Sequence, residues 1–523
     1  MNQTVLNILP APATIYSLPA ELLEDILLQS ISGTDNAWSL SHVCRGWRAR
    51  CMDRSAMWTS ISSQHSVPRL EETLRRSGTQ KLRIFLGVDY QRGNLTRRIR
   101  FVAEVVKACL HRIESLEFHL AGMTFDDVFK EIKFSPGTEA PVLRTVYVTC
   151  GEVDPFLRAF IGVRAPALEQ ASIAEIGGLL PDISAMWDGS TLQTLSLTEL
   201  REITVMELLG QLDRCKGLQC LSLSSSSLED SRTSRTARVM LPHLVHLSIT
   251  LGPKYMAELL NGLELPTLMT TSFMPASVHY EEDWSAYTQS LDNHVQGLVG
   301  SILRTIAPLL RRRRCSSIHL QDDLVVSGAR PPTPAGYPDG LPIMRIFFDR
   351  SFRIQTGLLE FAREIVFTIV AMQPTLQTLD VTVPVISFGN AWPVEGYLPT
   401  ESRERFAEVE STVLTRFFTL SARTVNDGGL LPSLTSINLR CVSDALQSDA
   451  VQSMSDCIAR LRDKAGHSFD LDLTVQELRD RPTFDESCGE PGWGFWSGPI
   501  ALPPRPDLGA LHIAGVNTRI RWV

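Results

Sequence analysis

A short pattern of apolar and variable positions recurs along the middle of the chain. It reads apolar, two variable residues, apolar, one variable residue, apolar, and its copies are 24 to 26 residues apart. An apolar residue at every second position is typical of a strand that is buried on one face. A fixed period is the signature of stacked structural units. The pattern therefore predicts a series of similar strands, which begin at Leu143, Leu168, Leu192, Leu218, Leu244 and Leu268, with an earlier copy at Ile113.

The segments between these strands carry apolar residues at helical spacing, as in residues 153–162, 204–215 and 254–263. A strand, a turn and a helix in each unit favour an α/β fold with parallel strands side by side. The period lies in the range of about 20–29 residues that leucine-rich repeats use. The asparagine or cysteine that such repeats place after the third apolar position is absent here. We therefore expect an irregular leucine-rich-repeat-like solenoid over residues 78–480, and an ordinary α/β sheet is the alternative.

The period lengthens in the second half of the chain. Residues 274–300 predict an insertion or long loop, followed by a helix over residues 295–311. The strand pattern then returns at Cys315, Ile343, Leu376 and Leu434, and once more in residues 469–475.

The composition of several segments predicts insertions and irregular ends of the chain. Residues 328–342 and 387–404 are rich in Pro and Gly, and they predict insertions because such stretches cannot continue a helix or a strand. Residues 481–523 predict an irregular tail, and residues 1–16 a disordered lead. Residues 81–89 alternate and predict the first strand.

The first sixty residues follow a helical pattern instead. After Pro19, which suits a first helical turn, apolar residues recur at helical spacing: Leu22, Leu23, Ile26 and Leu27. A second helix is expected to carry on one face Leu40, Val43, Cys44, Trp47 and Cys51. A third, short element contains Met57, Trp58 and Ile61. Three short helices bury little apolar surface by themselves, so another element or a partner must cover part of it.

Residues 17–61 resemble an F-box. The family pattern runs Leu-Pro, two residues, Leu-Leu, an Ile-Phe-like pair, a gap, Leu-Ser-x-Val-Cys-x-x-Trp and a closing Leu-Trp. The matching residues are Leu18, Pro19, Glu21, Leu22, Leu23, Ile26, Leu27, Leu40, Ser41, Val43, Cys44, Arg45, Trp47, Met57 and Trp58. With its repeats, the chain resembles fungal F-box proteins that have a degenerate leucine-rich-repeat region.

The resemblance implies a function without catalysis. F-boxes bind the Skp adaptor of a cullin-RING ubiquitin ligase, and the rest of such a chain captures a protein substrate. By motif match, the adaptor contact is expected from Leu18, Pro19, Leu22, Ile26, Leu40, Val43 and Trp58. At least one of Trp47 and Trp58 is expected to fill the core of the three helices. The alternative is a repeat scaffold outside any ligase, in which the helices only cap the array.

Composition narrows the class of protein. Apolar residues make up 44% and charged residues 21%, as in folded proteins. A net charge of -8 disfavours nucleic acid or an anionic membrane as the main partner. The ten cysteines form no CxxC pair and are expected to be reduced and buried, as in a cytoplasmic or nuclear protein. No apolar run reaches the roughly 18 residues that would span a bilayer.

Motifs for chemistry are weak. The phosphate-loop, nucleophile-elbow and zinc-protease motifs are absent, so no cofactor or metal is expected, and an enzyme on an unfamiliar fold is the least favoured hypothesis. His243 and His246 are expected on opposite faces of one strand. Residues 311–314, all arginine, fit an import or acidic-partner patch, or the solvated end of a helix. The acidic residues 281–283 mark a candidate recognition loop.

Overall fold

The computed structural model describes a large part of the chain in two compact units. The units comprise residues 1–203 with 211–218, and residues 204–210 with 219–523. The described residues are 18–30, 36–87, 95–120, 134–135, 137–150, 160, 162–174, 190–200, 203–225, 228–229, 238–275, 284–313, 315–320, 323–328, 343–347, 365–366, 369–370, 373, 376–382, 433–442, 448–476, 507–514 and 516–522.

The first unit opens with short helices. They are α1 (Ala20–Ser30), α2 (Asn36–Val43), α3 (Arg45–Asp53) and the 3-10 turn η2 (Ser55–Trp58). The single helix expected over Leu40 to Cys51 is wrong, because the chain is extended at Cys44, with φ -158° and ψ 169°. The Cys44 sulfur accepts the backbone N–H of Trp47 at 3.4 Å and so caps α3. The break separates Leu40 and Val43 from the helix that carries Trp47.

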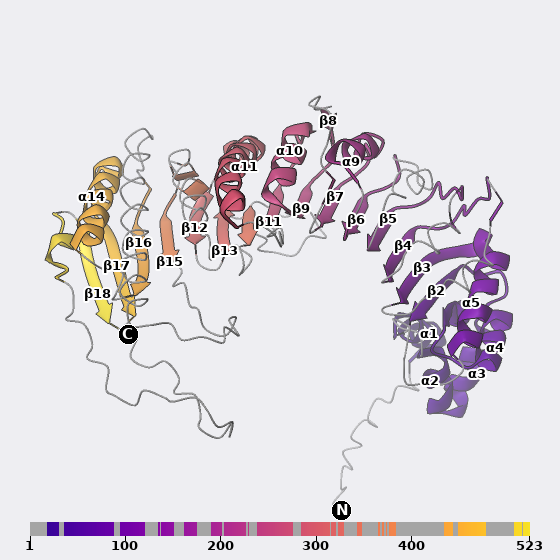
Figure 1. Ribbon diagram of the computed structural model, residues 1–523. Helices are drawn as coiled ribbons and strands as arrows, with labels where there is room; N and C mark the ends of the chain where they lie inside the picture. The colour runs from indigo at the N-terminus through magenta and orange to yellow at the C-terminus, as the bar shows by residue number, and fades with distance from the viewer. Residues whose placement is uncertain are drawn as a thin grey trace, which may run out of the picture. The chain divides into compact units, whose positions relative to one another are not determined.

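A parallel sheet forms the rest of the first unit (Figure 1). Its strands pair in chain order, β1 (Ser60–Ser62), β2 (Leu82–Gly87), β3 (Ile113–Leu120), β4 (Thr145–Cys150), β5 (Gln170–Ala174) and β6 (Thr194–Thr198). The helical elements between the first strands are α4 (Val67–Ser77), α5 (Leu95–Cys109) and η3 (Leu110–Arg112). The expected first strand is β2, and the three-residue β1 that precedes it is too short for the alternation to reveal.

The second unit is also built on a mostly parallel sheet (Figure 1). Its strand order is β7-β9-β11-β14-β13-β12-β15-β16-β17-β18, and β13 is antiparallel to both of its neighbours. The strands are β7 (Cys220–Ser224), β9 (His246–Leu251), β11 (Thr270–Pro275), β12 (Cys315–Leu320), β13 (Asp323–Gly328), β14 (Met344–Phe347), β15 (Thr378–Thr382), β16 (Ser436–Val442), β17 (Phe469–Gln476) and β18 (Val516–Trp522).

Helices and short elements complete the described part of the chain. The helical elements are α9 (Val205–Leu212), α10 (Pro253–Gly262), α11 (Trp284–Arg312), α14 (Ser448–Ala465) and η7 (Gly509–Leu511). Strands β8 (Val239–Met240) and β10 (Leu263–Glu264) form a separate parallel pair. None of the helices in the described ranges is long and apolar enough to cross a membrane.

A recurring turn explains the strand period. The first leucine of the pattern lies just before its strand, is 0–1% exposed, and donates its N–H to the carbonyl three residues earlier at 3.0–3.4 Å. This arrangement is found at Leu143, Leu168, Leu218, Leu244 and Leu268. Each turn brings the next strand into parallel register, for example Gln170 beside Thr145 and Thr270 beside His246. The same buried leucine and the same backbone hydrogen bond therefore recur before each of these strands.

The predicted strands and the helices over 204–215 and 254–263 are confirmed, and the fold is α/β with mostly parallel strands. The helix expected over residues 153–162 lies outside the described residues, apart from residues 160 and 162. The loop expected over 274–300 is wrong in its second part, because α11 begins at Trp284. The irregular tail is wrong at its end, because β18 pairs in parallel with β17. Strand pairing across distant segments, which local composition does not record, explains this last error.

Candidate protein-interaction site

The helices at the amino end close a small core of their own. Its buried members come from α1, α2, α3 and η2, and Trp38, Leu40, Trp47 and Met52 pack against them while partly exposed. The fully enclosed residues are Leu23, Leu27, Ala37, Cys51, Met57 and Trp58. Burial raises the pKa of the Cys51 thiol, so it is protonated and behaves as a small apolar side chain.

The opposite side of α1 is apolar and faces solvent. Leu18, Leu22 and Ile26 are four residues apart, which places them on one side of the helix and its entry, and they are 36%, 51% and 43% exposed. We call these three residues the α1 stripe. Among the described residues, five of the seven exposed large apolar side chains lie in or beside α1 and α2, the other two of these five being Leu28 and Val43. Such clustering of exposed apolar side chains is typical of an interaction surface.

The predicted adaptor residues divide between this surface and the core. Pro19 is exposed and Val43 is 59% exposed, while Leu40 is half-buried against the core. The assignment of Trp58 to the contact is wrong, because this side chain is 1% exposed. Its indole N–H donates to the backbone carbonyl of Cys51 at 2.7 Å, so Trp58 shapes the unit from within.

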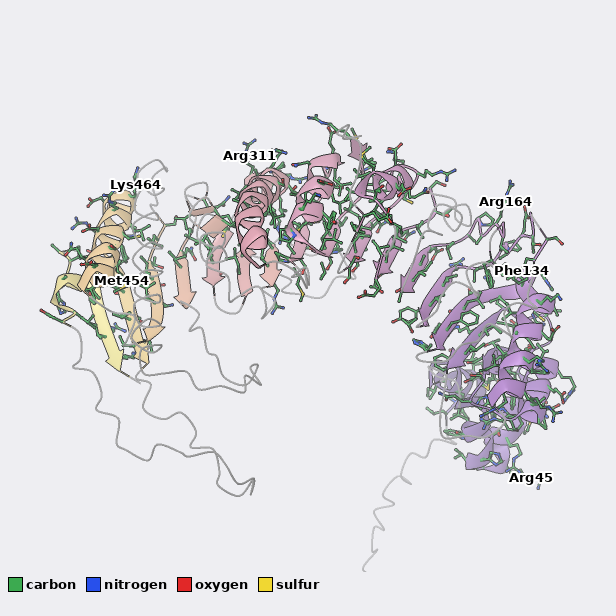
Figure 2. The ribbon with its side chains drawn as sticks, viewed as in Figure 1. Arg45, Phe134, Arg164, Arg311, Met454 and Lys464 are labelled. Atoms are coloured by element: carbon green, nitrogen blue, oxygen red, sulfur yellow. The ribbon has the colours of Figure 1, made fainter. Side chains whose placement is uncertain are left out.

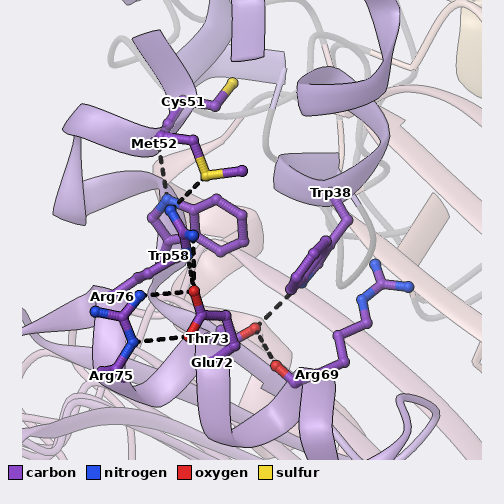
Figure 3. Close-up of polar contacts among 9 residues, drawn as sticks. All are labelled: Trp38, Cys51, Met52, Trp58, Arg69, Glu72, Thr73, Arg75 and Arg76. Atoms are coloured by element: carbon purple, nitrogen blue, oxygen red, sulfur yellow. Dashed lines mark hydrogen bonds and ion pairs between the residues drawn. The ribbon is translucent and has the colours of Figure 1, made fainter. Parts of the chain in front are cut away.

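Helix α4 anchors the amino-terminal helices to the sheet unit (Figure 3). The Trp38 ring meets the Trp58 ring edge-on, with centroids 5.1 Å apart. The Trp38 indole N–H donates to the Thr73 hydroxyl at 3.2 Å. The guanidinium groups of Arg69 and Arg76 lie 5.0 Å and 4.9 Å from the rings of Trp38 and Trp58. The motif match does not include Trp38 or α4, and the amphipathic pattern of residues 67–77 is the one sequence signal for this contact.

Ion pairs hold α1 against α3. Glu24 pairs with Arg50 at 3.7 Å and, in a shorter contact, with Arg54. Exposed pairs of this kind each contribute less than about 1 kcal/mol. The two pairs join α1 to the second half of α3 and to Arg54, the residue that follows it.

Acid should lower the stability of the folded chain by protonating Glu72 on α4. Hydrogen bonds from Arg75 and then Arg76 lower the pKa of Glu72 to about 2, from an ordinary 4.5. A lowered pKa stabilises the folded chain above the ordinary value, and this contribution is lost as the pH falls toward about 2. We expect Glu72→Gln to lower the thermal midpoint slightly at about pH 6 and to have no effect near pH 2. Glu71→Gln is the matched control, since Glu71 forms no ion pair with the described residues, and equal behaviour of both variants would contradict the expectation.

Two histidines and several cysteines are the remaining candidates from the sequence. The expectation that His243 and His246 lie on one strand is wrong, because His243 lies in the turn before β9, while His246 lies on the strand and contacts the Thr270 hydroxyl. Across the described ranges, no cluster of three His, Cys, Asp or Glu side chains is arranged to hold a metal. Burial raises the pKa of Cys315 and Cys457 to about 12, as expected for inert buried thiols. Residues 281–283 lie outside the described residues.

The arginine run has a structural role. Arg312 donates to the Leu268 carbonyl at 3.3 Å and Arg313 to the Met269 carbonyl at 3.0 Å, which ties the end of α11 to the turn before β11. Burial lowers the pKa of Arg313. Arg311 points away from the strands (Figure 2). Two of the four arginines are therefore occupied by backbone carbonyls, and Arg314 lies outside the described residues.

Comparison of the chain with protein-family models gives no match, and comparison with curated protein sequences gives none either.

Proposed function

We propose that the chain is the substrate-recognition subunit of a cullin-RING ubiquitin ligase of the SCF type. In this proposal residues 17–61 are an F-box that binds a Skp-type adaptor through the α1 stripe and Val43. Residues 78–480, to which both units contribute, are an irregular leucine-rich-repeat-like region that binds a target protein. The chain performs no chemistry itself, and it acts by raising the concentration of target lysines near a ubiquitin-loaded enzyme.

The α1 stripe is the observation that carries the proposal. The core behind it is already filled by Leu23, Leu27 and Trp58, so the exposed leucines are not needed to close the fold. Apolar side chains without such a need cost solubility, and a permanent partner that covers them removes that cost. Burying Leu22 and Ile26 from their half-exposed state would contribute about 1 to 1.5 kcal/mol each.

Co-purification tests the proposal. A tagged full-length chain, co-expressed with a Skp-type adaptor, should retain the adaptor. The double variant Leu22→Asp, Ile26→Asp should weaken binding by about a hundredfold, because it removes about 2–3 kcal/mol of apolar burial and forces two carboxylates into the interface. Met240→Asp is the control, since Met240 is 49% exposed but distant in the chain. Adaptor binding that survives the double variant, or that is absent from the unaltered chain, would overturn the proposal.

The scaffold hypothesis has one observation in its favour. Trp38, Arg69, Thr73 and Arg76 tie the amino-terminal helices to α4, as expected of a cap on the end of a repeat array. A cap leaves the α1 stripe without a role. Under this hypothesis the unaltered chain captures no adaptor, and the double variant behaves as the unaltered chain does in every binding assay.

A further inference from the structure

Three rings form a cluster on the half-exposed face of the first sheet. Phe85 of β2, His119 of β3 and Tyr147 of β4 alternate with the buried residues of their strands. The His119 ring lies between the other two, with centroids 5.2 Å from Phe85 and 4.9 Å from Tyr147. Most other side chains of this face are small, as in the β5 and β6 residues Ser172, Thr194, Ser196 and Thr198. The cluster therefore stands out from a surface of short hydroxyl side chains.

The surrounding residues are arranged to keep the rings in place. A side chain at Gly87 would collide with the Phe85 ring, because a Cβ atom there would lie 2.5 Å from it. The absence of a side chain thus lets the Phe85 ring lie along β2 toward His119. His119 Nδ1 lies 3.0 Å from the Thr149 hydroxyl, which itself donates to the Phe118 carbonyl at 3.4 Å. Because the Thr149 hydroxyl hydrogen is directed to the Phe118 carbonyl, the Thr149 oxygen is placed to accept a hydrogen bond from Nδ1 of His119, which fixes the orientation of the ring.

The Glu117 carboxylate lies on the same face of the sheet, two residues before His119 on β3, and forms no ion pair with the described residues. Glu117 pairs in register with Phe85 on one side and Tyr147 on the other. Its hydrogen-bond partner is the Ser115 hydroxyl at 3.4 Å. Arg83 of β2 lies on the same face but makes no ion pair with it at 4.0 Å or less. The Glu117 carboxylate and the faces of the Phe85 and Tyr147 rings both attract a positively charged donor.

We infer that this cluster is a binding site for an arginine side chain of the target protein. A guanidinium group is planar, can stack on the rings of Phe85 or Tyr147, and can donate hydrogen bonds to Glu117 at the same time. A lysine ammonium offers the charge but not the flat face. The inference deepens the proposed function, since the arginine would belong to the captured substrate, and it assigns the substrate a basic recognition segment.

The direct test uses the full-length chain and two small probes. Acetyl-arginine methylamide carries the guanidinium, and acetyl-citrulline methylamide has the same shape without the charge. Saturation-transfer NMR should detect binding of the arginine probe and about fivefold or greater weakening for the citrulline probe, as expected when a cation–π contact and an ion pair are lost. Glu117→Gln and Tyr147→Ser should each weaken the arginine probe by a similar factor, while Tyr147→Phe retains the ring and binding.

The controls separate this site from the adaptor site. Ser196→Ala is the control on the same face. Ser196 is in register with Glu117 through Tyr147 and Ser172, and its substitution should leave probe binding unchanged. Each variant should keep the thermal midpoint of the unaltered chain and its adaptor binding. Equal affinity for both probes, or no response to Glu117→Gln, overturns the arginine site whatever the adaptor assay shows. Loss of adaptor binding alone overturns the ligase proposal and leaves this site standing.

Discussion

Trp58→Ala should destabilise the amino-terminal helices by about 3–5 kcal/mol, the usual cost of removing a large aromatic side chain from a core. Trp58 is 1% exposed and makes three kinds of contact that the substitution removes. These are the edge-on ring contact with Trp38, the hydrogen bond to Cys51 and the approach of Arg76. Since whole domains are stable by about 5–15 kcal/mol, such a loss should leave α1 to α3 barely folded.

Hydrogen exchange measured by mass spectrometry would show this loss locally. Peptides from residues 20–58 and 67–77 should lose protection together, because Trp38 and Trp58 join these segments. Trp58→Phe keeps an aromatic ring and should cost about 1 kcal/mol, near the net value of the lost hydrogen bond. Leu22→Ala is the surface control and should stay within about 0.5 kcal/mol. Unchanged protection combined with lost adaptor binding would contradict this expectation and would show that Trp58 contacts the adaptor.

Gln373→Met should open the second unit locally at an expected cost of about 2–6 kcal/mol, because two buried backbone groups lose their partner at about 1–3 kcal/mol each. Gln373 is 4% exposed. Its side-chain carbonyl accepts the N–H of Cys315 at 3.2 Å, and its amide donates to the Leu310 carbonyl at 3.0 Å. The side chain thus joins the end of α11 to the start of β12, where a helix terminus leaves carbonyls unpaired.

The rate of thiol labelling at Cys315 measures this opening. The Cys315 thiol is buried, with a pKa of about 12, so in the folded chain it should react slowly with iodoacetamide. Gln373→Met should raise the rate by at least about thirtyfold, the equivalent of about 2 kcal/mol. The matched control is Gln377→Met, since Gln377 is exposed and its side chain forms no hydrogen bond with the residues that the structure describes. Cys457, buried in α14 of the same unit, is an internal reference, and equal acceleration at both thiols would indicate global unfolding instead of local opening.

Gln373 also differs from the residues that stand at the same position in the other turns. At the turn position that Gln373 occupies, other described turns carry the small or apolar residues Ala140, Ala165, Cys215, Leu241 and Leu265. A backbone hydrogen bond closes each of those turns, and in the turn before β9 the Thr267 hydroxyl also donates to the Pro242 and Leu244 carbonyls at 2.8 Å and 3.0 Å. The absence of a regular asparagine ladder therefore does not leave the turns unformed, and Gln373 supplies side-chain hydrogen bonds where β13 and β12 interrupt the parallel order.

Most of the strands and the helices α1, α9 and α10 could be predicted from local pattern, whereas contacts from Leu18, Leu22 and Ile26 were expected only from the resemblance to an F-box. Strand alternation and helical spacing are visible within a few residues. The neighbours of Leu168 in the chain therefore predict a strand, and those of Leu22 predict a helix. The periodicity did not divide Leu22 from Leu23, and the structure shows that Leu23 is buried while Leu22 is exposed. For these strands and helices the amino-acid order suffices, because the forces that decide them act between residues close in the chain.

Other features depend on partners that are distant in the chain. The break at Cys44 divides an apolar run that looks continuous, and Trp58 is buried because α4 and Trp38 cover it. Strand β18 is stabilised by its pairing with β17, and buried Gln373 bonds to the end of α11 and the start of β12, which lie about sixty residues earlier in the chain. The ring cluster around His119 requires three strands in register and a bare Gly87 beneath Phe85. Folding creates these environments by bringing remote residues together, so no local pattern could have contained them.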